Sequence, residues 1–260
     1  MIEHVTATRY VTPLREGGSL PGIVEADDLG TYVLKFSGAG QGLKVLVAEV
    51  IVGELARRLG IAVPELHAVQ LDEVIAKYEA DEEVQDLLTA SVGLNLRVDF
   101  LPGAFGFDAA SSPDPELAAK VLWLDAFVAN VDRSWRNPNL LNWHGRMWCI
   151  DHGAALYFHH GCTEELGSAE RFAAQPYDAT DHVLSRFRKG VPAADEQLSP
   201  LITRDLLTDV VGCVPEDWIE PVGVADSDAV RAAYVEHLLA RNTDDRPWLD
   251  GLMTTSGGRV

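Results

Sequence analysis

The sequence predicts an α+β protein of two lobes, in which a small antiparallel sheet with one main helix precedes a mostly helical lobe. Three short runs of strand-forming residues, separated by turns, occupy residues 1–36. Apolar residues at helical spacing follow at residues 45–59, and the second half of the chain is mainly helical in pattern. A Pro-Gly pair after a predicted strand marks a hinge, so the expected domains are residues 1–102 and 103–260.

The composition excludes several classes of function. A chain of 260 residues, 47% of them hydrophobic, can bury a core without a disulfide or a structural metal. The net charge of −19 argues against nonspecific nucleic-acid binding and against attachment to an anionic membrane. No apolar run approaches the roughly 20 residues that span a membrane, and the first residues lack the pattern of a signal peptide. The three cysteines are an odd number at irregular spacing, which favours a reducing, cytoplasmic setting.

The third predicted strand, residues 31–36, separates one lysine from its apolar neighbours. Leu34 and Phe36 face one side of the strand, and Lys35 faces the other. A lysine in this position reaches solvent by default, and the alternative is that it points into a cleft and meets phosphate.

The main predicted helix carries one acidic residue among apolar ones. It runs from about residue 45 to residue 59, and Gly60 followed by Pro64 marks its end. Glu49 lies in its second turn. A buried glutamate needs a cationic partner, and Lys35 is the candidate.

The other elements follow from turn residues and periodicity. Asp114 as N-cap and Pro115 at the first helical position begin a helix with a buried apolar stripe. The remaining predictions are strands at residues 61–71 and 94–101, a helix at 81–90, a hairpin of 140–141 and 147–150 turning at 144–145, and helices at 203–211 and 228–241.

The stretch from residue 130 to residue 153 carries the residues with the clearest chemistry. Asp132 comes first, Asn137 and Asn139 follow, and Asp151 closes the stretch. One aspartate can orient an attacking hydroxyl, while an amide oxygen and the second carboxylate can hold Mg²⁺ against a triphosphate. Alone, each group is commonly a surface ion pair or a turn. The interpretation therefore depends on their order and on the lysine, glutamate and glycine-rich turn upstream.

Two parts of the chain resemble the HipA-like kinases. The strand that contains Lys35, with Glu49 in a helix that leads into Leu-Gly-Ile-Ala-Val-Pro-Glu, is similar to the small lobe of that family. The Asn-Val-Asp-Arg and Ile-Asp-His-Gly segments around Asp132 and Asp151 resemble its catalytic and metal-binding loops, and also those of phosphatidylinositol kinases. The resemblance covers about residues 10–160. It implies a protein-kinase-like fold and transfer of the γ-phosphate of ATP to a hydroxyl with Mg²⁺.

The resemblance implies a role for each matching residue in nucleotide binding. Lys35 would hold the α- and β-phosphates, and Glu49 would hold Lys35. A glycine-rich turn would lie over the phosphates, and a segment before the hinge would meet adenine through its backbone. These two sets are Gly17, Gly18 and Ser19, and Asp99, Phe100 and Leu101.

In the loops, the resemblance makes Asp132 and Arg133 catalytic and Asp151 a ligand of Mg²⁺. Residue 134 is a serine where these families often have histidine, so a phosphate contact is either missing or supplied by Arg133 or Arg136. The second metal ligand is left open. Asn137 has the family's spacing of five residues after Asp132, whereas Asn139 precedes two leucines as in the kinase Asn-Leu-Leu pattern.

Three alternatives compete with an active kinase. The first is a nucleotide-binding pseudokinase or regulatory module, and the second is an enzyme of the same fold that transfers AMP. The third is a metal-binding protein built on Cys149, His152, His159, His160 and Cys162, which lack the paired spacing of a zinc site. The expected partner is a protein or a soluble small-molecule hydroxyl acceptor, with no nucleic acid or membrane, and the sequence sets no oligomeric state.

Overall fold

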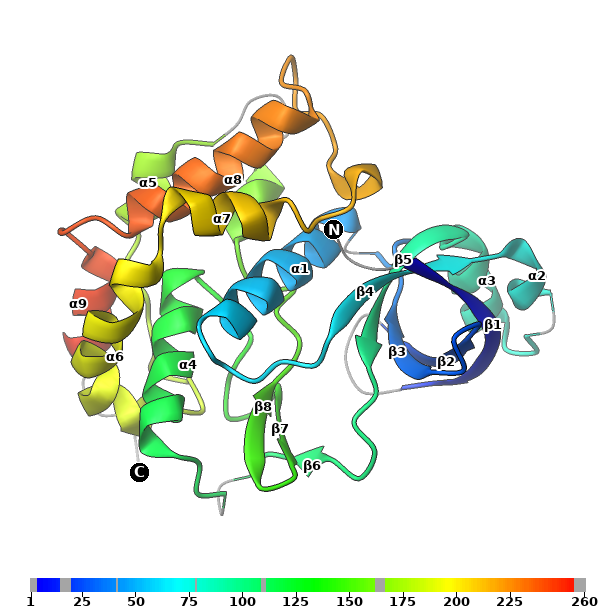
Figure 1. The fold of residues 1–260 in the computed structure, drawn as a ribbon, viewed down its shortest axis with the longest axis horizontal. Helices are drawn as coiled ribbons and strands as arrows, with labels where there is room; N and C mark the ends of the chain where they lie inside the picture. Colours follow the sequence, from blue (N-terminus) through cyan, green and yellow to red (C-terminus); the bar gives the residue numbers. More distant parts are fainter. Residues whose placement is uncertain are drawn as a thin grey trace.

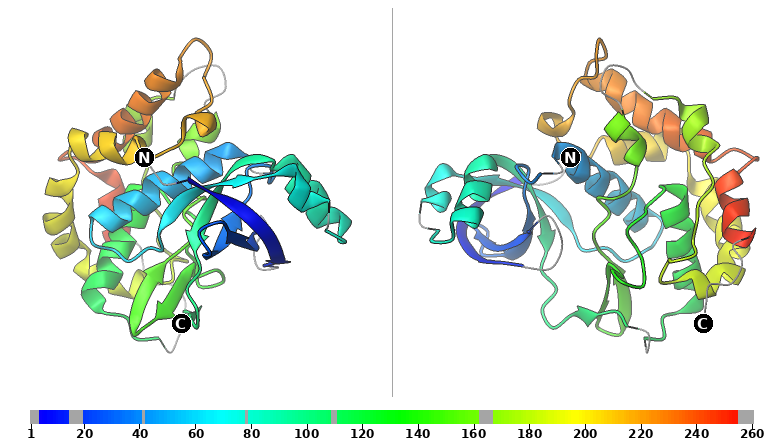
Figure 2. Two further views of the ribbon diagram at one scale, coloured as in Figure 1. Left: turned by 45° about the vertical axis from the view of Figure 1, so that its right-hand side comes forward. Right: turned by 180° about the vertical axis from the view of Figure 1, so that it is seen from behind.

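The computed structural model describes residues 4–14, 20–40, 42–77, 79–108, 111–161 and 167–254. Within these residues the chain is a mixed α+β protein. A barrel of strands lies at one side, a group of helices lies at the other, and helix α1 lies between them (Figure 1). Figure 2 shows the same order from two further sides.

Five strands form the barrel, in the order β1-β2-β3-β5-β4. Their bounds are His4–Pro13 for β1, Gly22–Ala26 for β2, Thr31–Lys35 for β3, Leu66–Leu71 for β4 and Gly93–Asp99 for β5. The sequence predicted a small antiparallel sheet, and that prediction was incomplete. Strand β1 pairs in parallel with β4, from His4 opposite Ala68 to Thr6 opposite Gln70, and this pairing closes the barrel. Closure leaves no unpaired sheet edge in this part of the chain.

Strand β3 has the predicted alternation. Leu34 is fully buried and Phe36 is nearly so, and both belong to the apolar cluster that also holds Val24 of β2 and Val69 of β4. Because successive side chains of a strand point to opposite faces, Lys35 points away from this cluster. The prediction that Lys35 is separated from the apolar face is confirmed.

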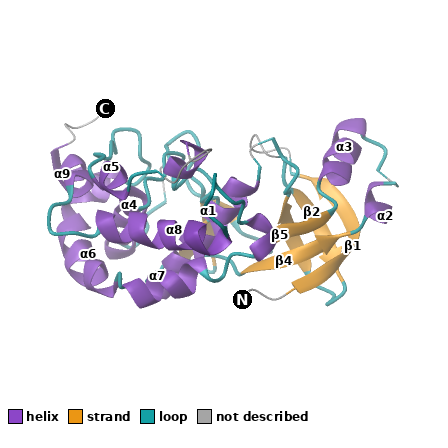
Figure 3. Cartoon of the chain, turned by 90° about the horizontal axis from the view of Figure 1, so that it is seen from above, coloured by secondary structure: helices purple, strands orange, loops and turns teal. Residues whose placement is uncertain are grey.

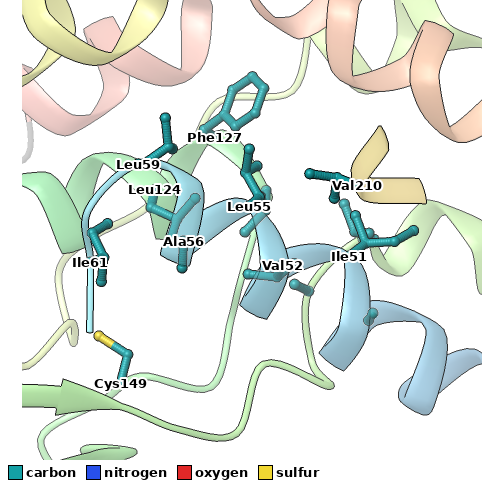
Figure 4. Close-up of a cluster of buried hydrophobic side chains, with 14 of the residues drawn as sticks. Ile51, Val52, Leu55, Ala56, Leu59, Ile61, Leu124, Phe127, Cys149 and Val210 are labelled. Atoms are coloured by element: carbon teal, nitrogen blue, oxygen red, sulfur yellow. The ribbon is translucent and has the colours of Figure 1, made fainter. Parts of the chain in front are cut away.

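Helix α1 (Leu43–Arg58) is the central element of the main core. Its apolar side chains, such as Ile51 and Leu55, belong to one buried cluster with residues of several other elements, among them Phe127, Cys149 and Val210 (Figure 4). An apolar helix that is covered on both sides has a fixed position relative to the barrel and to the helical part. The helix therefore holds Glu49, in its second turn, in a defined place.

Helix α4 (Pro115–Phe127) begins where its sequence indicates. The side chain of Asp114 accepts hydrogen bonds from the backbone N–H groups of Glu116 and Leu117, and Pro115 occupies the first turn. Ala129 follows the helix with a φ of 54°, in the left-handed region, and turns the chain toward Asn130.

The hairpin predicted at residues 140–150 is confirmed. Strands β7 (Leu140–Trp143) and β8 (Arg146–Cys149) are antiparallel and are joined by His144 and Gly145. Both turn residues have positive φ, 48° and 73°, as a two-residue hairpin turn of the favoured twist requires. A short strand, β6 (Phe105–Gly106), adds to β7 and was not predicted.

The remaining helices pack around α4 and α1 or against the barrel. Figure 3 shows the strands of the barrel gathered apart from most of the helices, with α2 and α3 beside the barrel. These helices are α2 (Glu73–Ala76), α3 (Glu82–Ala90), α5 (Ala169–Ala173), α6 (Val191–Leu198), α7 (Arg204–Val211), α8 (Ser227–Arg241) and α9 (Pro247–Thr254). Short 3₁₀ helices are η1 (Tyr157–Gly161), η2 (Ser185–Gly190), η3 (Ser199–Leu201) and η4 (Glu216–Trp218). None of the helices in the described ranges combines the length and the apolar character needed to cross a membrane.

Candidate active site

Lys35 joins two acidic residues from distant parts of the chain. Its ammonium group donates one hydrogen bond to Oε1 of Glu49 on α1 and another, of 2.9 Å, to Oδ1 of Asp151 after β8. The lysine side chain is 14% exposed, whereas that of Asp151 is 45% exposed. The structure thus brings together three of the residues that the sequence singled out, and the Glu49–Lys35 pair confirms the expected partner of the buried acid.

Glu49 also holds the segment after Asp151. It is 1% exposed, and its Oε1 accepts a 2.9 Å hydrogen bond from the backbone N–H of Gly153. A Cβ atom at residue 153 would lie 2.4 Å from Cγ1 of Val45 and 3.2 Å from Oε1 of Glu49. Only glycine allows this close approach of the loop to α1.

The charges of Lys35, Glu49 and Asp151 shift one another's pKa values. The Lys35 ammonium lowers the pKa of Asp151, so this carboxylate is ionised at neutral pH. Burial alone would lower the pKa of Lys35, but the carboxylates of Glu49 and Asp151 outweigh burial and raise it. Burial raises the pKa of Glu49 to about 7, with the repulsion of Asp151 in the same direction and the attraction of Lys35 opposed to it. Two carboxylates share one cation here, and Asp151, the more exposed of them, is the more acidic.

Asp132 lies at the start of the loop that follows α4. Its backbone N–H donates to Oδ1 of Asn130 over 3.1 Å, and its Oδ2 accepts a 3.0 Å bond from Nδ2 of Asn137. Nδ2 of Asn139 donates to the backbone carbonyl of Asp132 and lies 3.4 Å from its Oδ2. The loop therefore fixes the Asp132 carboxylate with two asparagine amides, both named by the sequence pattern.

The site contains one cleft of about 570 Å³. Lys35, Asp132, Asn137 and Asp151 contribute its polar wall. The rest of the lining comes from the segment after β3, the first turn of α1 and the segment 153–160. A concave site of this size fits a molecule as large as a nucleotide.

Arg133 was expected to be catalytic, but it does not lie in the cleft. It is 2% exposed. Its Nε donates to Oδ2 of Asp125 on α4 over 2.6 Å, and its guanidinium also contacts Nδ1 of His152. A guanidinium enclosed in this way cannot contact a phosphate in the cleft. Arg136, the other candidate, is exposed and stacks on the ring of Trp135 at 4.2 Å.

Asp125, the buried partner of Arg133, was not identified from the sequence. This fully buried acid also accepts hydrogen bonds from Nδ2 of Asn130 and, at 3.1 Å, from Nε2 of His182. Arg133 lowers the pKa of Asp125 well below its usual range, against the effect of burial. The signal in the sequence was an acid within the apolar run of residues 121–128, near the end of the helix, which requires a buried partner.

Two predicted nucleotide contacts are not part of the described cleft. Gly17, Gly18 and Ser19 lie outside the described residues. Asp99 ends strand β5, and Phe100 and Leu101 follow it, but none of these three lines the cleft. Their contact with adenine stays a prediction.

The alternative metal site of cysteines and histidines is not formed in the described part of the chain. No group of three or more His, Cys, Asp or Glu side chains in those residues could hold a metal ion. Cys149 is buried and burial raises the pKa of its thiol to about 12, while Cys162 lies outside the described residues. His152 is turned toward Arg133 instead.

The chain is similar to known kinases in its sequence family and in its fold. Residues 8–250 match the family model described as HipA-like kinase. The crystal structure of the proinflammatory kinase CtkA of Helicobacter pylori is similar over 97% of each chain, with 11% sequence identity and a TM-score of 0.55, which shows a kinase-like fold. The Golgi casein kinase structure is a weaker match, with 10% identity over 93% of this chain and 71% of that chain and a TM-score of 0.39. The comparison with curated proteins gave no match.

Proposed function

Because this chain belongs to the HipA-like kinase family, we propose that it transfers the γ-phosphate of ATP to a hydroxyl group with the help of Mg²⁺. The observation that supports this most is the contact of Lys35 with both Glu49 and Asp151 at the wall of a cleft that also holds Asp132. Phosphoryl transfer needs positioned charges more than covalent chemistry from the protein. A lysine, two carboxylates and an amide on one cleft supply those charges.

The barrel with α1 and the helical part would then act as the two lobes of a kinase, with the expected boundary at residues 102–103. Lys35 would neutralise phosphate oxygens of the nucleotide, and Glu49 would hold the lysine in place. Asp132 would orient the hydroxyl of the acceptor and accept its proton as the bond to phosphorus forms.

The donor set of the cleft fits Mg²⁺. This ion prefers oxygen ligands and is commonly bound by one or two carboxylates together with substrate phosphates. Asp151 presents a half-exposed carboxylate, and Asn137 lines the same cleft. Asn139 is 9% exposed and its amide is bonded to the carbonyl of Asp132, so we propose Asn137 as the second ligand. Bound Mg²⁺ would neutralise charge on the transferring phosphate.

The acceptor in this proposal is a hydroxyl of a protein or of a soluble small molecule. The net charge of −19 disfavours a polyanion such as a nucleic acid as the acceptor. Binding of the triphosphate itself depends on Lys35 and on the ion.

The test is ATP turnover by the purified protein with Mg²⁺, in the wild type and in two variants. We expect Asp132→Asn and Asp151→Asn each to lower turnover at least about 100-fold, because each removes a charge that acts at the reacting phosphate. Asp86→Asn, at an exposed position of α3 away from the cleft, is the matched control and should equal the wild type. Unchanged turnover in Asp132→Asn or Asp151→Asn, in folded protein, would sink the proposal.

A further inference from the structure

We propose that Arg133 is a positioning residue that fixes Asp132 and Asp151 relative to each other across the cleft, with Asp125 of α4 as its anchor. The inference rests on the proposed phosphotransfer, in which these two carboxylates must act on the same phosphate. It assigns a role to the buried polar group that the reaction itself does not use.

Asp125 holds the chain on both sides of Asp132. Its carboxylate accepts a 2.8 Å bond from Nδ2 of Asn130 and a 2.6 Å bond from Nε of Arg133. The backbone N–H of Asn130 also donates to the carbonyl of Asp125 over 2.8 Å. Residues 130 and 133 are therefore tied to one rigid helix, and the backbone at Asp132 between them has little freedom.

The guanidinium of Arg133 also holds the chain on both sides of Asp151. Nη1 of Arg133 lies 3.3 Å from the carbonyl oxygen of Ile150, and Nη2 lies 3.2 Å from Nδ1 of His152. Asp151 itself has a φ of 56°, in the left-handed region that residues with a side chain adopt at a cost. Such a conformation persists only where neighbouring groups fix it. Arg133 helps to fix it through its contacts with Ile150 and His152.

Holding these segments together requires arginine at residue 133. The guanidinium presents five N–H groups in one plane, and here it reaches a carboxylate, a ring nitrogen and the carbonyls of Asn139 and Ile150. A lysine has a single nitrogen and cannot reach acceptors on three separate segments. Nδ1 of His152 can accept from Arg133 only when the ring proton is on Nε2, so His152 takes part as a neutral ring.

Removing the contacts of Arg133 should make the loops that hold Asp132 and Asp151 more mobile together. His152 offers a matched pair of variants. His152→Leu removes the acceptor, whereas His152→Asn can place an amide oxygen where Nδ1 lies. Arg133→Lys is a third variant that keeps the charge. Arg231→Lys is the control, because Arg231 on α8 also bonds a carboxylate and two carbonyls, but its partners lie in residues 211–216 and do not line the cleft.

Hydrogen exchange on the protein without nucleotide is the first readout. We expect His152→Leu and Arg133→Lys to raise the exchange rates about 10-fold or more in residues 130–139 and 147–153 together, with barrel strands within about twofold of the wild type. His152→Asn should stay near the wild type. A rise of equal size over the whole chain, no rise in the two loops, or the same result for both His152 variants would overturn the inference.

Steady-state kinetics with ATP and Mg²⁺ give the second readout. A positioning role predicts that His152→Leu lowers kcat at least about 10-fold while KM for ATP changes less than about threefold, because binding groups remain and their geometry is lost. A change in KM alone would contradict it. A wild type that neither binds nor turns over ATP would refute the proposed function, whereas the exchange rates would still decide the inference on Arg133.

Discussion

The ammonium nitrogen of Lys35 lies 2.9 Å from Oδ1 of Asp151, although the two residues are 116 positions apart in the chain. The contact joins the end of strand β3 in the barrel to the loop after β8 in the helical part. Glu49 completes it from α1, which packs in the main core of the molecule. Three elements that are distant in sequence therefore meet at one wall of the cleft.

Replacing Lys35 should remove activity and leave the fold. Lys35→Met deletes the cation that we assign to the phosphates, and we expect a loss of about 100-fold or more in kcat/KM for ATP. The control is Lys189→Met, an exposed lysine on η2. Equal kcat/KM values for the two variants would show that Lys35 is only a structural partner of Glu49.

The two asparagines of the loop should differ in their dependence on Mg²⁺. Asn137→Ala removes an amide from the cleft, so we expect the Mg²⁺ concentration for half-maximal turnover to rise about 10-fold. Asn139→Ala instead removes a buried bond to the Asp132 backbone and should lower stability with a smaller effect on Mg²⁺. The assay is turnover against Mg²⁺ concentration at saturating ATP, and the reverse ranking would make Asn139 the ligand.

A side chain at residue 153 should separate α1 from the metal loop. The Cβ of Gly153→Ala would meet Val45 at 2.4 Å and must displace α1 or the loop, so turnover should fall about 10-fold or more. Gly161→Ala, where a Cβ would meet no atom of the described residues within 4 Å, is the matched control. Wild-type turnover in Gly153→Ala would show that the contact with Glu49 has no part in the reaction.

Arg241 should be important for stability. It is 1% exposed. Its guanidinium donates hydrogen bonds to the carbonyls of Ala126 (2.8 Å) and Phe127 (2.7 Å) at the end of α4, and to that of Phe172 (2.6 Å). Burial lowers its pKa to about 10. Arg241→Met leaves buried carbonyls without donors, and we expect a loss of at least about 3 kcal/mol in the free energy of unfolding.

Urea denaturation measures this loss, with Arg204→Met as the control. Arg204 forms an exposed pair with Glu236 on the surface, and such pairs contribute little. If the two variants unfolded at the same urea concentration, the carbonyls at the end of α4 would need another donor.

His159 should make the protein less stable in mild acid. Burial lowers its pKa to about 3, with the charges of His160 and Lys44 acting in the same direction. The unfolded chain takes up the proton near pH 6.5 and the folded chain does not, so the free energy of unfolding falls as the pH falls below 6.5. The expected loss is up to about 1.4 kcal/mol per pH unit from this residue.

The measurement compares the wild type with His159→Gln at pH 7.5, 6.5 and 5.5. Both proteins share the other titrating groups, including Glu49, so the difference between them isolates His159. Parallel pH profiles would contradict the shift.

The parts of the site that the sequence predicted depend on local patterns. The alternation of β3 set Lys35 apart from Leu34. The apolar neighbours of Glu49 in its helix predicted a cationic partner for that acid. The place of Arg133 depends on Asp125, eight residues earlier, and on a loop that returns seventeen residues later, so no local pattern shows its burial.

The closed barrel was missed for a similar reason. Its last pairing joins β1 to β4 in parallel across some sixty residues of other structure, and parallel pairing has no turn to mark it in the sequence. The hairpin of β7 and β8, whose turn lies between its strands, was predicted.

The central claim is that the cleft around Lys35 and Asp151 moves the γ-phosphate of ATP. It is tested most directly by incubating the wild type and Asp151→Asn with Mg²⁺ and ATP labelled at the α- or at the γ-phosphate, and following the label into protein, small acceptors and inorganic phosphate. The account predicts Mg²⁺-dependent transfer of the γ-label alone, lost in Asp151→Asn. Transfer of the α-label would identify an AMP-transferring enzyme. Bound ATP with neither label moved would identify a pseudokinase. Either result would contradict γ-phosphate transfer.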